Sequence, residues 1–271
     1  MTVLGVLALG ILIGPVNLFV LTKNNRPKLF FTIPIIAAAA SLLFVIVILM
    51  EDGIGGNGKR VAFITLAPES ATATIYQQQA SRCGALLGTS FSFDEPTLIT
   101  PVSLMGGRNG GTGNQTLSQS ATEFSGDWFK SRQKQIFNVS SVIPSRARID
   151  VSATSSQGDT VARKFTNTTN AAIHQIHFVD QEKNYYMHSG PLNPGDSVTI
   201  SAKPKGTAAV IKNGSDLTQL LDSETARQLT KILRAKGQII AFAENAPELC
   251  LDTLDSIEWD ASHAVLIQAI D

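Results

Sequence analysis

Four acidic side chains surround a tryptophan near the end of the chain, and they are the residues whose types most suggest chemistry. They are Asp252, Asp255, Glu258 and Asp260, and Trp259 stands between the last two. Carboxylates can bind Ca²⁺, and an indole ring offers a flat apolar surface on which a sugar can stack. Their spacing does not match a calcium-binding loop, and charged side chains are mostly exposed to solvent. We therefore weigh a weak ligand site at these residues against a solvated acidic surface.

Histidine supplies the other candidate ligands, at His174, His177, His188 and His263. A zinc site needs three or four converging ligands. His174 and His177 are three residues apart in a segment that we expect to be a strand, where such positions point to opposite faces. The hydrolase pattern Gly-x-Ser-x-Gly and the metalloprotease pattern His-Glu-x-x-His do not occur. We predict no catalytic residue, no metal and no cofactor.

The glycine-rich stretch 105–115 is not followed by the Lys-Ser or Lys-Thr of a phosphate-binding loop, so we expect a surface turn there. The two cysteines, Cys83 and Cys250, leave two alternatives open. A disulfide between them would close a long loop and stabilise the chain by up to about 5 kcal/mol. The alternative is a pair of buried, unpaired thiols.

The first 50 residues of the chain contain no Asp and no Glu. Two apolar runs, 3–21 and 29–50, are separated by the short polar stretch 22–28. About 20 apolar residues span a bilayer as a helix. The sequence therefore predicts a transmembrane helical hairpin over residues 1–50.

Two groups of residues in this hairpin have a specific expected role. We expect the packing of the two helices to depend on Gly14, Pro15, Asn17 and Pro34. Proline kinks a helix, and a buried amide can hydrogen-bond a neighbouring helix. We expect Lys23, Arg26 and Lys28 to set the orientation of the hairpin in the membrane, because short positive loops stay in the cytoplasm. We expect a two-pass protein of the cytoplasmic membrane, with its N-terminus and residues 51–271 on the outer side. A cleaved signal peptide is disfavoured, because no basic stretch precedes the first run.

The rest of the chain is nearly neutral. The sequence has 22 basic and 22 acidic side chains, and three of the basic ones lie in the hairpin, so residues 51–271 carry a net charge of −3. Such a region has no positive field for nucleic acid. We expect the partners to be the lipid bilayer and a protein of the membrane or envelope.

After a glycine-rich linker at 51–58, the pattern is that of strands. Apolar residues alternate with polar ones in 134–143 and 146–153, and turn signals separate further short strands. Residues 224–236 have the spacing of an amphipathic helix. We predict a mainly-β extracytoplasmic region, an antiparallel and immunoglobulin-like sandwich with at least one helix, over residues 59–271. It forms one unit or divides into 59–118 and 119–271.

Several of these stretches together resemble a group of uncharacterised bacterial membrane proteins that have a Gly-Pro-x-Asn transmembrane hairpin followed by a β-sandwich ectodomain. The matching stretches are Gly14 to Asn17, Lys23 to Lys28, Pro34, Trp128 to Gln133, Phe165 to Thr168 and Gly190 to Gly195. The resemblance implies a location and a fold, and it implies no catalytic residue. Members of the group usually carry a large extracytoplasmic region before the first helix, whereas this sequence starts at that helix.

Three functions follow as hypotheses. The first is a non-enzymatic, membrane-anchored protein that presents its β-sandwich to another protein or to an envelope component. The second is a subunit of a larger envelope transport or secretion complex. The third is an envelope carbohydrate-binding or hydrolytic module that uses the acidic cluster around Trp259.

Overall fold

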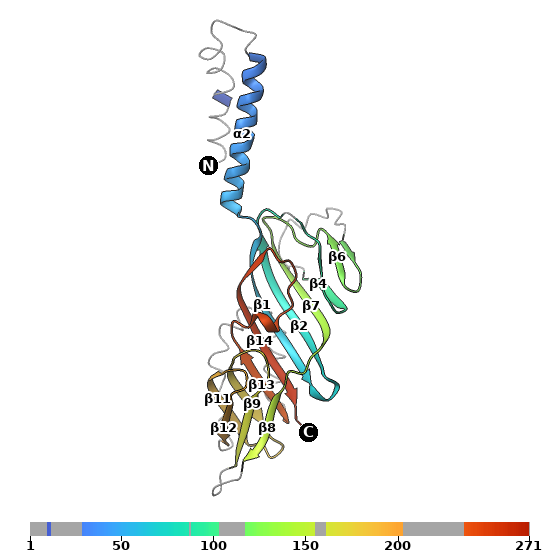
Figure 1. The fold of residues 1–271 in the computed structure, drawn as a ribbon, viewed down its shortest axis with the longest axis vertical. Coiled ribbons are helices and arrows are strands. Elements are labelled where there is room, and N and C mark those ends of the chain that lie inside the picture. Colours follow the sequence, from blue (N-terminus) through green and yellow to red (C-terminus); the bar gives the residue numbers. More distant parts are fainter. Residues whose placement is uncertain are drawn as a thin grey trace. The chain divides into compact units, whose positions relative to one another are not determined.

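The computed structural model of the chain describes residues 10–11, 29–86, 88–102, 117–154, 161–202 and 236–270. The chain divides into two compact units, Met1–Ile54 and Gly55–Asp271. The first unit contains the apolar helix, and the second contains the strands (Figure 1).

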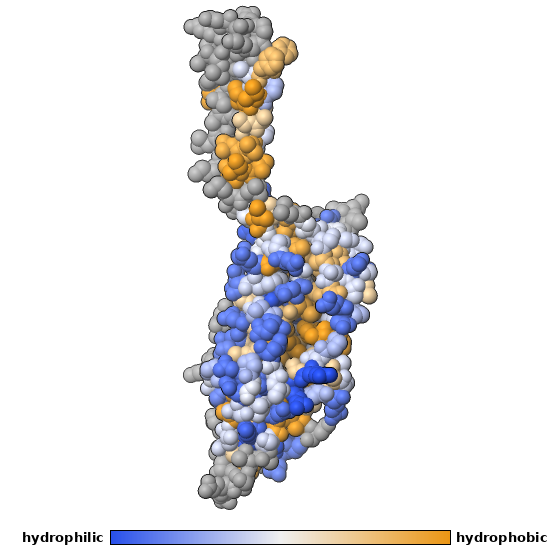
Figure 2. Space-filling view, in the orientation of Figure 1, coloured by the Kyte–Doolittle hydropathy of each residue, from blue (hydrophilic) through white to orange (hydrophobic). Residues whose placement is uncertain are grey.

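Helix α2 (Leu29–Asp52) confirms the second predicted apolar helix, and Pro34 lies inside it. The window Phe30–Val47 has a mean hydropathy of 2.6, and most of its side chains are exposed, with Ala40 buried. Among the described residues this is the one helix long and apolar enough to cross a membrane. Figure 2 shows its described surface as predominantly hydrophobic.

The first predicted helix, 3–21, lies outside the described residues except for Gly10 and Ile11, which are helical. The loop 22–28 is also outside them. Six of the residues singled out in the hairpin lie in these two segments, namely Gly14, Pro15, Asn17, Lys23, Arg26 and Lys28.

The connection between the helix and the first strand is shorter than the predicted linker 51–58. Helix α2 continues to Asp52, and strand β1 already begins at Gly56. The glycines of this stretch serve close packing as well. A side chain on Gly56 would come within 2.9 Å of the carbonyl oxygen of Arg82 on the neighbouring strand.

The described part of the second unit contains fourteen strands, which lie in three sheets. Their bounds are β1 (Gly56–Ala67), β2 (Thr72–Cys83), β3 (Phe91–Ser92), β4 (Thr97–Pro101), β5 (Leu117–Gln119), β6 (Glu123–Gly126), β7 (Lys134–Pro144), β8 (Ile149–Thr154), β9 (Ala162–Asn167), β10 (Ile173–Val179), β11 (Tyr185–Leu192), β12 (Ser197–Ser201), β13 (Gln238–Ala243) and β14 (Ile257–Ala269). Two short 3₁₀ turns, η3 (Pro68–Ser70) and η4 (Pro247–Leu249), accompany them.

The largest sheet has eight strands in the order β11-β10-β13-β14-β1-β2-β7-β4. Every neighbouring pair in it is antiparallel except β1 and β14, which run parallel over eleven residue pairs. The first and last strands of the unit therefore lie side by side in the middle of this sheet (Figure 1).

The two smaller sheets are associated with two separate cores. The sheet β12-β9-β8 contributes to the larger core, where Ile149, Phe165 and Ile200 join Ile64 and Leu266 of the large sheet. The sheet β3-β6-β5 contributes to a mainly aromatic core around Phe124 and Trp128. Both cores use residues of the same face of β2 and β7, which we call the front face.

A mainly-β region is thus confirmed, and the structure departs from the expected antiparallel pairing at β1 and β14, which run parallel. An alternating pattern identifies a strand and its buried face, and it does not identify the partner strand. Strands from both sides of residue 118 share the eight-stranded sheet. The predicted helix 224–236 lies outside the described residues except for Lys236.

Asn167 explains the paired motif that the sequence shows at Phe165 to Thr168 and Gly190 to Gly195. Its fully buried side-chain amide donates to the carbonyls of Ala171 and Leu192, both at 2.8 Å. Its side-chain oxygen accepts from the amide and the hydroxyl of Thr169. Asn167 therefore ties the turn after β9 to the end of β11.

We predict that Asn167→Asp lowers the free energy of unfolding by about 2–4 kcal/mol, because a carboxylate cannot donate to two buried carbonyls. Urea unfolding of the full chain, followed by tryptophan fluorescence, measures this change. The matched control is Asn170→Asp in the same turn, where the side chain is exposed and the expected change is within about 0.5 kcal/mol. Equal effects of the two substitutions would contradict the assignment.

Candidate functional site

A row of long polar side chains crosses the front face where the two cores meet. Cross-strand pairing aligns Gln79 of β2, Arg60 of β1 and Ser262 of β14. Arg60 is 2% exposed, and Gln77 and Gln79 are 0% and 1% exposed. These residues, together with Leu251 to Thr253 of the loop before β14, form what we call the polar network.

The guanidinium of Arg60 is held from three directions. Its Nε donates to Ser262 Oγ at 2.9 Å, and one Nη donates to the carbonyl of Leu251 at 3.1 Å. The same nitrogen pairs with the carboxylate of Asp252 at 2.5 Å, and the Asp252 side chain itself is 68% exposed. A buried charge without partners costs several kcal/mol, so the guanidinium of Arg60 can be buried only because it makes these contacts.

The two glutamines fix the same loop. Gln77 exchanges two hydrogen bonds of 2.8 Å with the backbone of Leu251, donating to its carbonyl and accepting from its amide. Gln79 donates to the hydroxyl of Thr253 at 3.1 Å and accepts from Gln77 at 3.0 Å. The polar network therefore pins residues 251–253 to the centre of the large sheet.

Trp259 packs into this arrangement. The guanidinium carbon of Arg60 lies 4.8 Å from the centre of its ring, in cation–π geometry. A side chain on Gly58 would come within 2.6 Å of the same ring. One face of Trp259 is thus occupied by the protein itself, which is an ordinary structural role for the indole.

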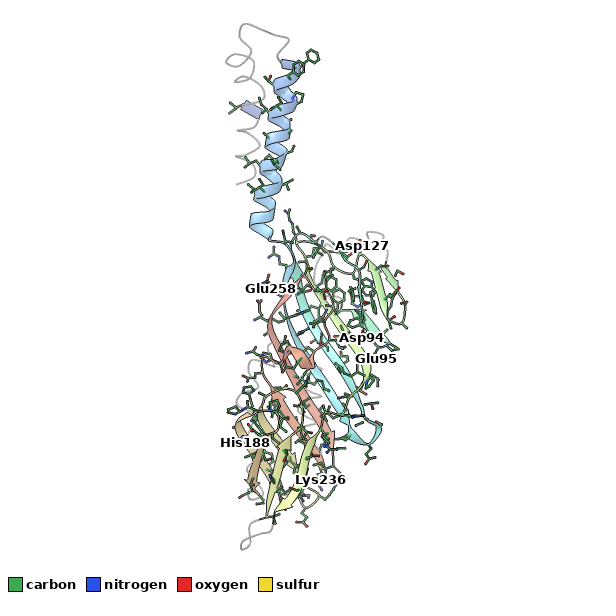
Figure 3. All side chains as sticks on the ribbon, in the orientation of Figure 1. Asp94, Glu95, Asp127, His188, Lys236 and Glu258 are labelled. Atoms are coloured by element: carbon green, nitrogen blue, oxygen red, sulfur yellow. The ribbon has the colours of Figure 1, made fainter. Side chains whose placement is uncertain are left out.

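The acidic residues predicted as a ligand site do not converge. Asp252 pairs with Arg60, whereas Asp260 lies 3.5 Å from the side-chain amide of Asn57. Asp255 and Glu258 are exposed. Figure 3 shows that Glu258 also lies apart from the other acidic residues labelled there, Asp94, Glu95 and Asp127. No group of three or more possible metal ligands exists among the described residues.

Of the two alternatives for Cys83 and Cys250, the structure has the unpaired one, because both are free cysteines. Leu251 bonds to Gln77, and Cys83 lies six residues further along β2, which is roughly 20 Å at the rise of a strand. A disulfide needs Cα atoms within about 7 Å. Burial raises the pKa of the Cys83 thiol and raises that of Cys250 to about 11.

The histidines contact different partners. His177 is 3% exposed, its Nδ1 lies 2.5 Å from the hydroxyl of Tyr185, and its Nε2 has no hydrogen-bond partner among the described residues. Burial lowers the pKa of His177 to about 4. The Nδ1 of His174 accepts instead from the backbone amide of Glu244.

Trp128 and Phe129, in the matching stretch Trp128 to Gln133, belong to the aromatic core. Their rings lie 5.6 Å from Phe124 and 5.3 Å from Phe137, respectively. The indole N–H donates to the carbonyl of Ser118 at 3.2 Å. Trp128 is therefore a core residue whose N–H group has the hydrogen-bond partner that a buried indole needs.

The back face of the large sheet changes from covered to open along its width. Phe242 and Val265, in the middle of the sheet, are 5% and 0% exposed. Tyr76 of β2, Leu98 of β4 and Val142 of β7 are 36%, 59% and 55% exposed. We call these last three residues the open apolar face. Two of them, Leu98 and Val142, line a hollow of about 500 Å³, and Tyr76 lies outside its lining.

Sequence reasoning missed both of these features. Gln77-Gln78-Gln79 is a weak signal for the polar network, because consecutive glutamines inside a central strand must place at least one side chain on a buried face. The open apolar face has no signal of its own, since it depends on which strands have a cover.

No protein-family model and no curated protein sequence matches the chain. Among solved structures, it is similar to the Fcho1 mu homology domain of Danio rerio with a bound Eps15 peptide. The identity is 7%, the TM-score is 0.35, and the alignment covers 80% of this chain and 98% of that one. At these values the similarity supports no statement about function.

We predict that Arg60→Met destabilises the protein by about 2–4 kcal/mol, because the Leu251 carbonyl and Ser262 lose a buried donor. Asp252→Asn should cost less than about 1 kcal/mol, since that carboxylate is largely exposed. Urea unfolding of both variants of the full chain measures the difference. A larger loss for Asp252→Asn would show that the ion pair, and not the hydrogen-bond network, is decisive.

His177 gives a prediction for pH. The unfolded chain takes up a proton near pH 6.5, whereas the folded protein resists it until about pH 4. The contribution of His177 to stability is therefore constant above pH 6.5 and falls by about 3 kcal/mol between pH 6.5 and 4. The difference in unfolding free energy between the wild type and His177→Phe, measured across this range, should show that slope. A difference independent of pH would contradict it.

Proposed function

We propose that the protein is a membrane-anchored, non-enzymatic binding protein. Helix α2 anchors the chain, and the β unit offers a surface to another protein or to an envelope component. The observation that carries this proposal is the apolar surface of α2, most of whose described side chains are exposed.

The apolar side chains of α2 surround the helix. Leu42 and Leu43 are 63% and 62% exposed, and Val45, Ile46 and Val47 follow at 41–51%. Residues at consecutive positions cover all sides of a helix, whereas a helix packed on a soluble domain has one apolar stripe. Fully burying each such side chain gains about 1.5–3 kcal/mol, so the hydrocarbon of a bilayer is the environment that suits α2.

We extend the proposal to the topology. The three positive side chains of the loop 22–28, and the absence of acidic residues from the first 50, favour a cytoplasmic loop between two spans. The N-terminus and the β unit are then on the outer side of the cytoplasmic membrane. The alternative of a subunit in a larger transport or secretion complex depends on Asn17, which is outside the described residues.

The topology predicts which engineered cysteines a membrane-impermeant maleimide reaches in intact cells. Asp255→Cys, at an exposed position of the β unit, should be labelled, whereas Asn25→Cys in the loop should react only after the membrane is opened. The native cysteines give a low background at neutral pH, because burial raises the pKa of both thiols.

Retention of the full chain in the membrane during alkaline extraction accompanies this experiment. Release into the supernatant would contradict the anchor. Retention with the opposite labelling pattern would leave the anchor and contradict the orientation.

A further inference from the structure

We propose that the open apolar face docks an uncharged, apolar segment of another polypeptide. This inference rests on the binding role proposed above and names the site and the chemistry of its partner. The site is the hollow between β4, β7 and the turn before β6, on the back face of the large sheet.

Its exposed apolar side chains are unusual within the β unit. Among the described residues of that unit, four large hydrophobic side chains are exposed, and three of them are Tyr76, Leu98 and Val142. Cross-strand pairing places Leu98 opposite Ser140 and Ser140 opposite Tyr76, so they form one continuous row. Two of the three strands, β2 and β7, are interior strands of the sheet, so a position at the sheet edge does not explain the exposure.

The lining of the hollow sets the charge of the partner. None of its residues is acidic or basic, and its apolar walls come from Pro96, Leu98, Ala121 and Val142. A charged group buried there would find no counter-charge, and such burial is costly. The occupant is therefore uncharged where it enters the hollow.

The polar groups of the lining separate into two sets. Thr97, Gln119 and Ser141 already donate to backbone carbonyls of this protein. The hydroxyls of Thr74 and Ser140 have no partner within the part of the chain that the structure describes. Two available hydroxyls beside apolar walls suit a polypeptide, which presents amide groups next to apolar side chains.

The partner lies on the face and does not extend the sheet at its edge. In β4 the outward backbone amide of Thr97 donates to Ala121, and its carbonyl accepts from the side chain of Gln119. Pro101, at the other end of β4, has no amide hydrogen. These features block addition of another strand to the β4 edge, as edge strands commonly require.

The test uses the full chain in phospholipid nanodiscs and two fluorescent peptides. One alternates leucine with serine and threonine and has neutral ends, and the other has its central leucine replaced by lysine. We expect the neutral peptide to bind saturably and the lysine peptide to bind about tenfold more weakly or worse, by fluorescence anisotropy. Leu98→Asp and Val142→Asp should each weaken binding of the neutral peptide by about tenfold or more.

The matched control is Val161→Asp, because Val161 is the fourth exposed hydrophobic residue and lies next to β9 in a different sheet. It should leave binding within about twofold of the wild type. Unchanged binding in the two face variants, equal binding of both peptides, or no saturable binding at all would overturn the inference. Self-association of the chain that Leu98→Asp abolishes would overturn it too, since the occupant would then be a second copy.

Failure of this inference and failure of the proposed function are distinguishable. The same variants are extracted with alkali and labelled for topology. A protein that stays anchored with its β unit outside, yet binds no peptide at Leu98 and Val142, retains its proposed anchoring while this docking site is wrong.

Discussion

The buried guanidinium of Arg60 is the constraint on which the arrangement of the β unit depends. It lies on β1, beside the parallel β14, where the first and last strands of the unit meet. A buried positive charge must be surrounded by acceptors, and the strands supply only Ser262. The loop before β14 therefore comes to the sheet and contributes the Leu251 carbonyl and the Asp252 carboxylate. The ring of Trp259 covers the guanidinium and requires a glycine at position 58.

In this arrangement the buried polar residues of the front face have a structural role. Asp252 and Trp259, two of the residues that suggested a ligand site, contact Arg60 on the front face. Asn167 likewise ties the turn after β9 to the end of β11. The surface that remains available is apolar and lies on the back face, at Tyr76, Leu98 and Val142. Such an exposed apolar face on a β unit is suited to binding another polypeptide.

Most strands could be predicted from the sequence, because period-two alternation marks a half-buried strand wherever one face is solvated. The start of β14 has the same pattern, because Ile257, Trp259 and Ala261 alternate with Glu258, Asp260 and Ser262. The parallel pairing of β1 and β14 could not be predicted, since it joins residues about 200 positions apart and leaves no local pattern. The role of Arg60 was hidden for the same reason: its partners come from distant parts of the chain.

The central claim is that the polar network pins the loop 251–253 to the sheet. Amide hydrogen exchange at Leu251, measured on the full chain, tests it most directly. The Leu251 amide is outside any strand and donates to the side chain of Gln77. The account predicts that it exchanges as slowly as the amides of β1 and β14, because only opening of the sheet would release it. Exchange at the rate of exposed loop amides would contradict the claim.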